Sequence, residues 1–426
     1  MKKISLITLI VLISGVCQTL SAQKTKEIIG YFPSWQMYKR NGCVVPEVLS
    51  YSKYSILNYS FYCPDKEGNL QGTDAWADSI LLKGKIDWSK PQPAYFPNSS
   101  LIDYAHLYGI KVMVSIGGWT LSDNFPKIAA DPKKRAHFAA ECVKLLKEYQ
   151  FDGIDIDWEY PGYDEHSGTK EDKDTYPLFM KAIRDSIDAY GNKLNYHFLL
   201  TGAFGANIPQ MENIKWDQIT FMDYFNMMTY DFNGTWSDDA NHNSPLYNPA
   251  KGYKGSLDEA FRLMTQTYKV PAEKLNMGVA FYGRSLRGFD GDEPITVYRT
   301  GHQKKADDVI FAEWEGSPSY YNILEEMKKH GYKEYWDDVA KVPYLVSEQE
   351  KSFVTYDNEK SIKLKAEYIV NNKCAGAIIW DASCDYVEKK PGSSLIAGTP
   401  LLDQLNIVFY GDKEGIVRPR IKKRWK

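Results

Sequence analysis

Residues 152–161 read DGIDIDWEYP, and three acids in this stretch, Asp155, Asp157 and Glu159, lie two positions apart. Four of the six residues from Phe151 to Ile156 are apolar or glycine, which is typical of a buried parallel strand. Because successive side chains of a strand alternate between its two faces, we expect the three acids to share one face. Burying three acids together is costly unless they share protons or accept hydrogen bonds, which favours one carboxyl group that stays protonated near neutral pH and acts as a general acid.

A structural explanation of the acids competes with this functional one. An isolated Asp-x-Asp pair is usually a solvated edge or a turn. Here, however, the acids alternate with Ile154 and Ile156, and the turn-forming pair Pro161-Gly162 follows the run. A solvated face would not be embedded in an apolar segment, so the functional interpretation is favoured.

Seven other short apolar segments resemble this strand, and each ends near a polar or aromatic cluster. Helical patterns separate several of them; Phe138, Cys142 and Leu145, for example, recur at steps of three and four residues. Alternating strands and helices predict a parallel sheet, and eight such units predict a closed (β/α)8 TIM barrel of the α/β class. The candidate catalytic residues lie at strand C-termini, where barrel active sites form. The eight predicted strands lie near 28–33, 54–61, 111–116, 151–157, 196–203, 222–228, 276–281 and 375–380.

One interval, from about Leu286 to Glu350, is too long for a single helix. It contains strand-like stretches at 295–298 and 309–314 and a helical stretch at 320–330, which predict a small α+β insertion domain between strands seven and eight. The predicted organisation is therefore a barrel in two parts, 23–285 and 351–410, separated by the insertion at 286–350 and followed by a basic tail at 411–426.

The N-terminal segment resembles a cleavable secretory signal. Two lysines precede an uncharged apolar stretch from Ile4 to Val16, and small residues end at Ala22. The stretch is short for a membrane-spanning helix, so an uncleaved anchor is the less favoured alternative. We expect residues 1–22 to be removed after Ala22, leaving a secreted or periplasmic monomer without a membrane contact.

Charge and metal-ligand patterns exclude several classes of function. Removing residues 1–22 takes away two lysines and no acids, so the formal net charge changes from −3 to −5. The basic run at 418–426 is expected to be a solvated tail, so no nucleic-acid partner is predicted. Neither the seven histidines nor the cysteines show metal-ligand spacing, and we expect no metal and no cofactor. The odd number of cysteines after cleavage implies at least one free thiol; they are Cys43, Cys63, Cys142, Cys374 and Cys384.

The acidic run resembles the catalytic strand of family 18 glycoside hydrolases, whose pattern D-x-x-D-x-D-x-E is matched by Asp152, Asp155, Asp157 and Glu159. Two other family motifs are similar: Ser-Ile-Gly-Gly-Trp at 115–119 and Met-Thr-Tyr-Asp at 228–231. The resemblance extends, in the expected order, over essentially the whole chain after residue 22. Shorter matches are Gly-Tyr-Phe at 30–32, Asn-Tyr-Ser-Phe at 58–61, Phe-Tyr-Gly-Arg at 281–284 and Ile-Ile-Trp at 378–380.

The resemblance implies a bacterial-type secreted chitinase that hydrolyses β-1,4 bonds between N-acetylglucosamine units by a retaining, substrate-assisted mechanism. Glu159 would be the acid and base, and the substrate's own 2-acetamido oxygen would attack the anomeric carbon to form an oxazolinium ion. Asp157 would orient the acetamido N–H, and Tyr230 would donate a hydrogen bond to its carbonyl oxygen. Asp155 would share a proton with Asp157 and Glu159.

The resemblance also assigns residues that bind the substrate or support the site. Trp380 would form the floor beneath the distorted sugar, and Trp119 would stack on a sugar on the leaving-group side. The pocket around the distorted sugar would be lined by Tyr31, Phe61, Met228 and Tyr282, with polar contacts from Asp231 and Arg284. Structural support would come from Ser115, which would hydrogen-bond Asp155, from Gly117 and Gly118, which would leave room for close backbone approach, and from Asp152.

Two alternatives remain beside chitinase. An endo-β-N-acetylglucosaminidase acting on N-glycan cores shares the acidic motif, although the inserted segment and the Trp-Glu-Tyr-Pro ending favour chitinase. A non-catalytic chitin-binding lectin on the same barrel belongs to a different class. Intact Glu159, Asp157 and Tyr230 argue against the lectin.

Overall fold

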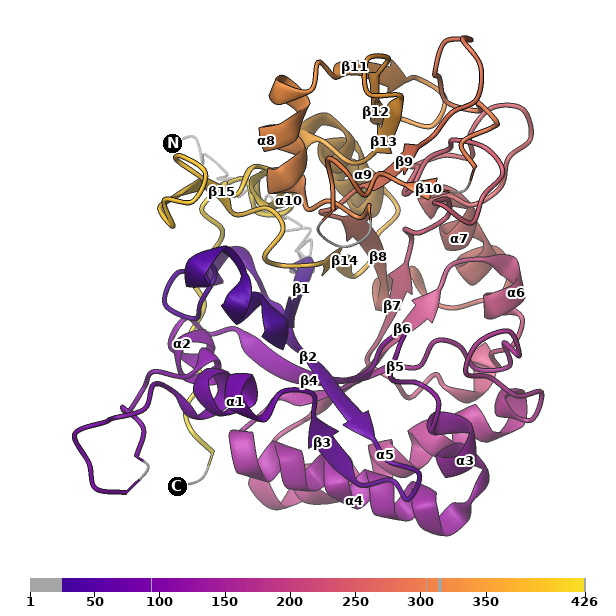
Figure 1. Cartoon of the computed structure of the whole chain (residues 1–426). Helices are drawn as coiled ribbons and strands as arrows, with labels where there is room; N and C mark the ends of the chain where they lie inside the picture. The colour runs from indigo at the N-terminus through magenta and orange to yellow at the C-terminus, as the bar shows by residue number, and fades with distance from the viewer. Residues whose placement is uncertain (1–24, 93, 304, 313–315, 425–426) are drawn as a thin grey trace, which may run out of the picture.

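Eight parallel strands close into a barrel in the computed structural model, which describes residues 25–92, 94–303, 305–312 and 316–424. The strand order is β1-β14-β8-β7-β6-β5-β4-β2, and β1 pairs with β2 to close the ring (Figure 1). The predicted α/β barrel is therefore confirmed. The strands are β1 (Glu27–Pro33), β2 (Ile56–Pro64), β4 (Lys111–Gly117), β5 (Gly153–Asp157), β6 (Leu199–Gly205), β7 (Tyr224–Met228), β8 (Leu275–Ala280) and β14 (Gly376–Trp380), and the short β3 (Leu70–Gly72) adds to β2 antiparallel.

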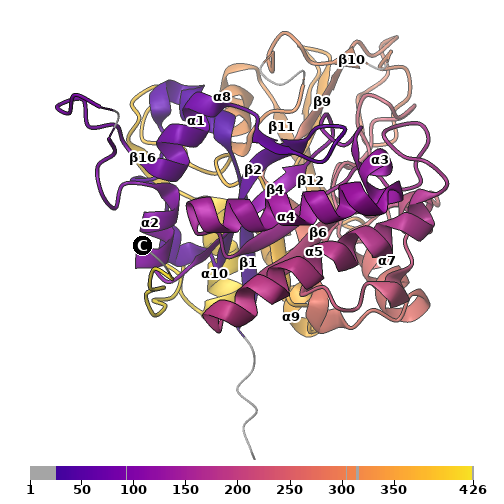
Figure 2. The same ribbon diagram turned by 90° about the horizontal axis from the view of Figure 1, so that it is seen from below.

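Helices cover the outside of the barrel. Figure 2 shows the two longest, α4 (Pro132–Tyr149) and α5 (Asp172–Leu194), side by side, and the two are in contact. Asp131 starts α4 by accepting hydrogen bonds from the backbone N–H groups of Lys133 and Lys134. The other α-helices around the barrel are α1 (Ala75–Asp78), α2 (Leu101–Leu107), α3 (Phe125–Ala130), α6 (Ile208–Met211), α7 (Leu257–Arg262), α9 (Glu359–Asn371) and α10 (Pro400–Tyr410).

The barrel has two apolar layers. The larger one lies between strands and helices; it includes Phe138, Cys142 and Leu145, the helical stripe predicted from the sequence. The smaller one includes Tyr31 and Met228, from strands β1 and β7. Burial of this apolar surface is the main source of stability, because none of the five described cysteines forms a disulfide.

A five-stranded antiparallel sheet lies between β8 and β14 in the chain and beside the barrel in Figure 1. Its order is β10-β9-β13-β12-β11, and helix α8 (Tyr320–Lys329) matches the predicted helical stretch at 320–330. The prediction of a strand at 295–298 is wrong, because these residues form no strand. The prediction of a strand at 309–314 is wrong over residues 309–312, and Trp314 lies outside the described residues. The division of the chain into domains stays a prediction. The strands are β9 (Arg284–Arg287), β10 (Lys305–Ala306), β11 (Lys333–Asp337), β12 (Val342–Ser347) and β13 (Ser352–Thr355).

The incorrect strand predictions have a physical reason. Ile295 and Phe311 are apolar and buried, as strand residues often are. Ile295 packs on Leu286 and Phe353 of the small sheet without joining a strand ladder. Burial beneath a loop therefore produces the same local pattern as burial in a strand.

The basic C-terminal segment is largely exposed, as expected of a solvated tail, but it also contacts the barrel at several points, so that expectation is only partly correct. The backbone N–H of Ile421 donates to the carbonyl of His106, and Lys423 lies 2.9 Å from Asp103. Arg424 inserts beneath β5, with its side chain only 8% exposed. These contacts join the chain terminus to α2 and to the start of the acidic strand.

The predicted signal segment, residues 1–22, lies outside the described residues. Within the part of the chain that the structure describes, no helix is long and apolar enough to cross a membrane.

A two-stranded ribbon, β15 (Val387–Glu388) and β16 (Ile396–Gly398), leads from β14 to α10.

Candidate active site

Asp155 lies inside the barrel and accepts hydrogen bonds from four other strands. Tyr31 on β1 and Ser115 on β4 donate to Oδ2 at 2.9 and 2.8 Å, so the hydrogen bond predicted between Ser115 and Asp155 is present. Thr201 on β6 and Asn226 on β7 donate to Oδ1. Burial raises the pKa of Asp155, and the four donors oppose that increase. This carboxylate is fully used in joining the strands.

Asp157 is buried too, but it has fewer partners. Its Oδ1 makes no hydrogen bond within the described part of the chain. Burial raises the pKa of Asp157 well above its ordinary value, and the charges of Glu159 and Asp155 raise it further. Asp157 therefore takes up a proton more readily than an ordinary aspartate, and its Oδ1 is available for a ligand.

Glu159 follows the end of β5 and is only partly exposed. Burial raises the pKa of Glu159 to about 7, and the negative charge of Asp231 contributes in the same direction. Its backbone N–H donates to Ser122 Oγ at 3.0 Å, which holds the residue against the loop after β4. Near neutral pH both protonation states are populated, as a residue that alternates between acid and base requires.

Gly117 and Gly118 allow the loop after β4 to pack closely on β5. Their φ angles are +116° and +98°, a region that favours glycine. A Cβ on Gly117 would lie 2.1 Å from the Asp157 carbonyl oxygen, to which the N–H of Gly118 donates at 2.7 Å. A Cβ on Gly118 would lie 3.0 Å from the ring of Phe61. Both glycines therefore support the acidic strand by close approach.

Aromatic side chains surround the acids at the same end of the barrel. Trp380, at the end of β14, stacks on Phe61 with ring centroids 5.8 Å apart and also contacts Tyr31 at 5.9 Å. Tyr230 and Tyr282 contact edge to face at 6.1 Å. Met228 belongs to the same inner layer of residues.

Asp231 and Arg284 form an ion pair near these aromatic side chains. Two guanidinium nitrogens of Arg284 lie 2.8 and 2.6 Å from Asp231 Oδ1, which also accepts from the Tyr282 hydroxyl at 2.7 Å. The guanidinium carbon lies 5.1 Å from the ring centre of Trp236. Asp231 and Arg284, the two residues predicted to make polar contacts to the substrate, are therefore paired with each other.

Asp152 is the one residue of the acidic motif that lies away from this group. It precedes β5, at the opposite end of the strand, and accepts from the backbone N–H of Val112, from His106 and from Tyr196. These hydrogen bonds join the start of β5 to α2, to β4 and to the segment before β6.

Sequence reasoning missed several residues at the site. Trp35 lies 6.2 Å from Phe61, and its position just after β1 was a signal that could have identified it. Asp381 follows Trp380 and accepts a hydrogen bond from Gln36. Trp236 stands in a long loop after β7, where no local pattern distinguishes it.

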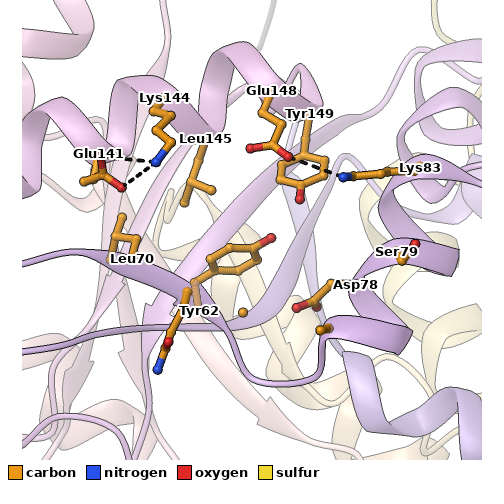
Figure 3. Close-up of a pocket in the computed structure, with 13 residues that line it drawn as sticks. Tyr62, Leu70, Asp78, Ser79, Lys83, Glu141, Lys144, Leu145, Glu148 and Tyr149 are labelled. Carbon is orange, nitrogen blue, oxygen red and sulfur yellow. Dashed lines mark hydrogen bonds and ion pairs between the residues drawn. The ribbon is translucent and has the colours of Figure 1, made fainter.

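A cavity of about 420 Å³ lies elsewhere, on the outer wall of the barrel (Figure 3). It opens between β3 and α4, and ion pairs such as Lys83–Glu148 stand at its edge. None of the residues predicted to act in the site lines it. The described residues also hold no cluster of three or more histidines, cysteines or acids with the geometry of a metal site.

Comparison with known proteins agrees with this geometry. The model of glycosyl hydrolases family 18 matches residues 27–385. The chain belongs to this family. Chitinase A1 of Niallia circulans is 34% identical in an alignment of 410 positions that covers 86% of this chain and 58% of that protein. Endochitinase 1 of Metarhizium robertsii is 32% identical, over 87% of this chain and 83% of that protein.

One solved structure is similar to this family 18 chain over nearly the whole length of the chain. Chitinase ChiA74 from Bacillus thuringiensis superimposes with a TM-score of 0.80 at 29% identity, covering 91% of this chain and 70% of that one. The chain spans little more than half the length of the Niallia protein and 28% of the length of chitinase ChiA from Flavobacterium johnsoniae.

Proposed function

We propose that this family 18 chain is a chitinase that cleaves β-1,4 bonds between N-acetylglucosamine units with net retention. The observation that carries the proposal is the placement of Asp157 and Glu159 at the end of β5, beside a group of aromatic side chains, where burial raises the pKa of both acids. The names of the relatives support the same substrate class. Aromatic side chains suit sugars, because the apolar face of a pyranose ring packs on an aromatic plane.

Glu159 begins the reaction by giving its proton to the glycosidic oxygen. The 2-acetamido carbonyl oxygen attacks the anomeric carbon, the glycosidic bond breaks, and an oxazolinium ion forms. Asp157 accepts from the acetamido N–H and stabilises the positive charge, while the Tyr230 hydroxyl donates to the acetamido oxygen. Water then adds to the anomeric carbon as Glu159 takes one of its protons, and the bond between that carbon and the acetamido oxygen breaks. This restores the acetamido group and the acid and gives the β anomer.

Asp155 has a supporting part in this mechanism. Its four hydrogen bonds hold both of its oxygens, so it remains an acceptor throughout. Its negative charge contributes to the raised pKa of Asp157. Asp157 and Glu159 therefore titrate as a coupled pair beside a carboxylate that stays ionised.

Exchange of Glu159 tests the assignment. Glu159→Gln keeps the shape of the side chain and removes the transferable proton, so turnover of N-acetylglucosamine hexamer should fall at least 100-fold while binding by calorimetry remains. Glu165→Gln, an exposed acid six residues away, is the matched control and should keep full activity. Glu159→Gln activity within a few-fold of wild type would disprove the role.

Substrate assistance makes a separate claim. Fully deacetylated oligomers lack the acetamido nucleophile and should resist cleavage, and the first product from acetylated oligomers should be the β anomer by proton NMR. A high-mannose glycopeptide assayed in parallel distinguishes chitinase from endo-β-N-acetylglucosaminidase. Rapid cleavage of the glycopeptide alone would replace the proposed substrate.

Export is part of the same proposal. The layout of residues 1–22 supports cleavage after Ala22 and a secreted or periplasmic monomer. Mass spectrometry of the protein from the exporting cell should give Gln23 as the first residue, and an intact Met1 would overturn this part.

A further inference from the structure

His166 lies flat against the indole of Trp119. The two ring centroids are 3.7 Å apart and the ring planes differ by 4°. Trp119 is 51% exposed, so one of its faces is covered by the imidazole while much of the side chain remains open to solvent. Tyr160 contacts Trp119 with its ring edge at 6.3 Å. Trp119 is therefore held on one face and available on the other.

The imidazole is itself anchored to the catalytic segment. His166 Nδ1 lies 3.0 Å from the backbone carbonyl oxygen of Glu159, which accepts the hydrogen bond. The neighbouring residue, Ser167, accepts from Trp158 Nε1 at 3.2 Å and donates to Asp123 at 2.6 Å. The loop after β5 is thus tied both to Glu159 and to the loop that carries Trp119.

We propose that His166 is a positioning residue that fixes the plane of Trp119 relative to Glu159. This inference rests on the proposed function, in which Trp119 stacks on the sugar that leaves. A half-exposed tryptophan loses rotamer freedom when a sugar binds, and a fixed indole has lost it beforehand. Because the same imidazole is hydrogen-bonded to the backbone carbonyl of Glu159, the indole that stacks on the leaving sugar and the backbone that carries the proton donor are held in one geometry.

The proposal predicts a loss that depends on the leaving group. His166→Ala should lower kcat/KM on N-acetylglucosamine hexamer about 3- to 10-fold, the range expected from losing one aromatic contact. Hydrolysis of di-N-acetylchitobiosyl β-fluoride should change less than 2-fold, because fluoride places no sugar on Trp119. Trp119→Ala should show the same selectivity, and the double variant should be no worse than Trp119→Ala.

Two further variants separate the stack from the hydrogen bond. His166→Phe keeps a flat ring against the indole and loses the donor to Glu159, whereas His166→Gln keeps a donor and loses the ring. If stacking is the main contribution of His166, His166→Phe should have more activity on the hexamer than His166→Gln. His137→Ala, an exposed histidine on α4, is the matched control and should leave both substrates unaffected.

A readout independent of activity tests the stack itself. In protein labelled with 5-fluorotryptophan, the Trp119 resonance is identified by its absence from Trp119→Phe. His166→Ala should shift and narrow this fluorine signal, because the indole leaves a fixed ring and becomes mobile. If His166→Ala does not fold, the same comparison is made with His166→Gln.

Each outcome of these experiments either establishes or overturns the positioning role of His166. An unchanged fluorine signal, or equal losses on hexamer and fluoride, would overturn the positioning role. A wild-type enzyme inactive on both substrates would overturn the proposed function, and with it the catalytic part of this inference. A shifted fluorine signal together with a loss on hexamer alone would establish the role.

Discussion

Arg424 Nη1 lies 2.6 Å from Oδ1 of Asp152, the first acid of the family motif, at the end of β5 opposite Glu159. The guanidinium also donates to the carbonyls of Gln150 and Phe151 and stacks 4.2 Å from the ring centre of Tyr196. Burial alone would raise the pKa of Asp152, but His106 and Arg424 lower it below its ordinary value. The C-terminal segment therefore stabilises the start of the catalytic strand.

Arg424→Ala should lower the free energy of unfolding by about 2–3 kcal/mol, because it removes a charged partner from a fully buried carboxylate. A carboxyl with a lowered folded pKa contributes stability above its unfolded pKa and loses it as the pH falls through the folded value. The effect should thus be complete at pH 7 and shrink below about pH 4. Urea unfolding of Arg424→Ala and of the wild type, at pH 7 and below pH 4, measures this difference in the free energy of unfolding.

Arg420→Ala is the matched control, since Arg420 is exposed in the same segment. It should change stability by less than about 0.5 kcal/mol. Equal effects of the two arginine variants would mean that the tail acts only through general charge.

The barrel was predictable because each of its strands carries its own apolar run. The partners of Asp155 were not, apart from Ser115. Tyr31, Thr201 and Asn226 come from strands far apart in the sequence. The family resemblance assigned Tyr31 to the pocket but not to Asp155, and a lone threonine or asparagine in a strand has no distinguishing pattern. Closure of the barrel brings them together, so the network depends on tertiary structure.

The attachment of the C-terminal tail to the barrel was not predicted, for a related reason. A run of basic residues usually indicates solvation, and composition carries no information on a distant acid. Arg424 finds Asp152 across 272 residues of sequence, next to Tyr196 and Phe198. His166 was missed in the same way, because its partner Trp119 stands in another loop.

Asp157→Asn should stabilise the fold at alkaline pH while slowing the reaction. Asp157 has a raised folded pKa, so the fold loses stability as the pH rises from the unfolded value of about 3.9 toward the folded one. Replacement by a neutral amide removes that loss. The melting temperature should rise by a few degrees at pH 8 and change little at pH 4 by calorimetry.

An exposed acid is the comparison for that variant. Asp217→Asn alters the same charge on the surface and should leave the melting temperature nearly unchanged at both pH values. A decrease on Asp157→Asn at pH 8 would show that the carboxyl group stabilises the site.

Gly117→Ala should reduce activity at least 10-fold, because its Cβ would lie 2.1 Å from the Asp157 carbonyl and force β4 and β5 apart. Gly252→Ala is a matched control: Gly252 also has a positive φ, +81°, but nothing lies within 4 Å of a Cβ there. It should lose only about 1 kcal/mol of stability from backbone strain and keep its activity. Similar kinetics for both variants would indicate that strain alone matters.

Lys365 on α9 forms a fully buried ion pair with Asp357, with Nζ 2.6 Å from Oδ2. The ammonium group also donates to Ser244 Oγ at 2.9 Å, and that hydroxyl donates to the carbonyl of Thr229, the residue before Tyr230. A buried charge thus supports the segment that carries a proposed contact to the substrate.

Lys365→Met should lower the free energy of unfolding by about 3–5 kcal/mol, because it leaves Asp357 charged and unpaired in the interior. Adding Asp357→Asn removes that charge and should recover part of the loss in urea unfolding. Lys363→Met changes an exposed lysine of the same helix and should cost less than about 0.5 kcal/mol. If the double variant is less stable than Lys365→Met alone, the remaining hydrogen bonds of Asp357, and not its charge, hold the segment before Tyr230 in place.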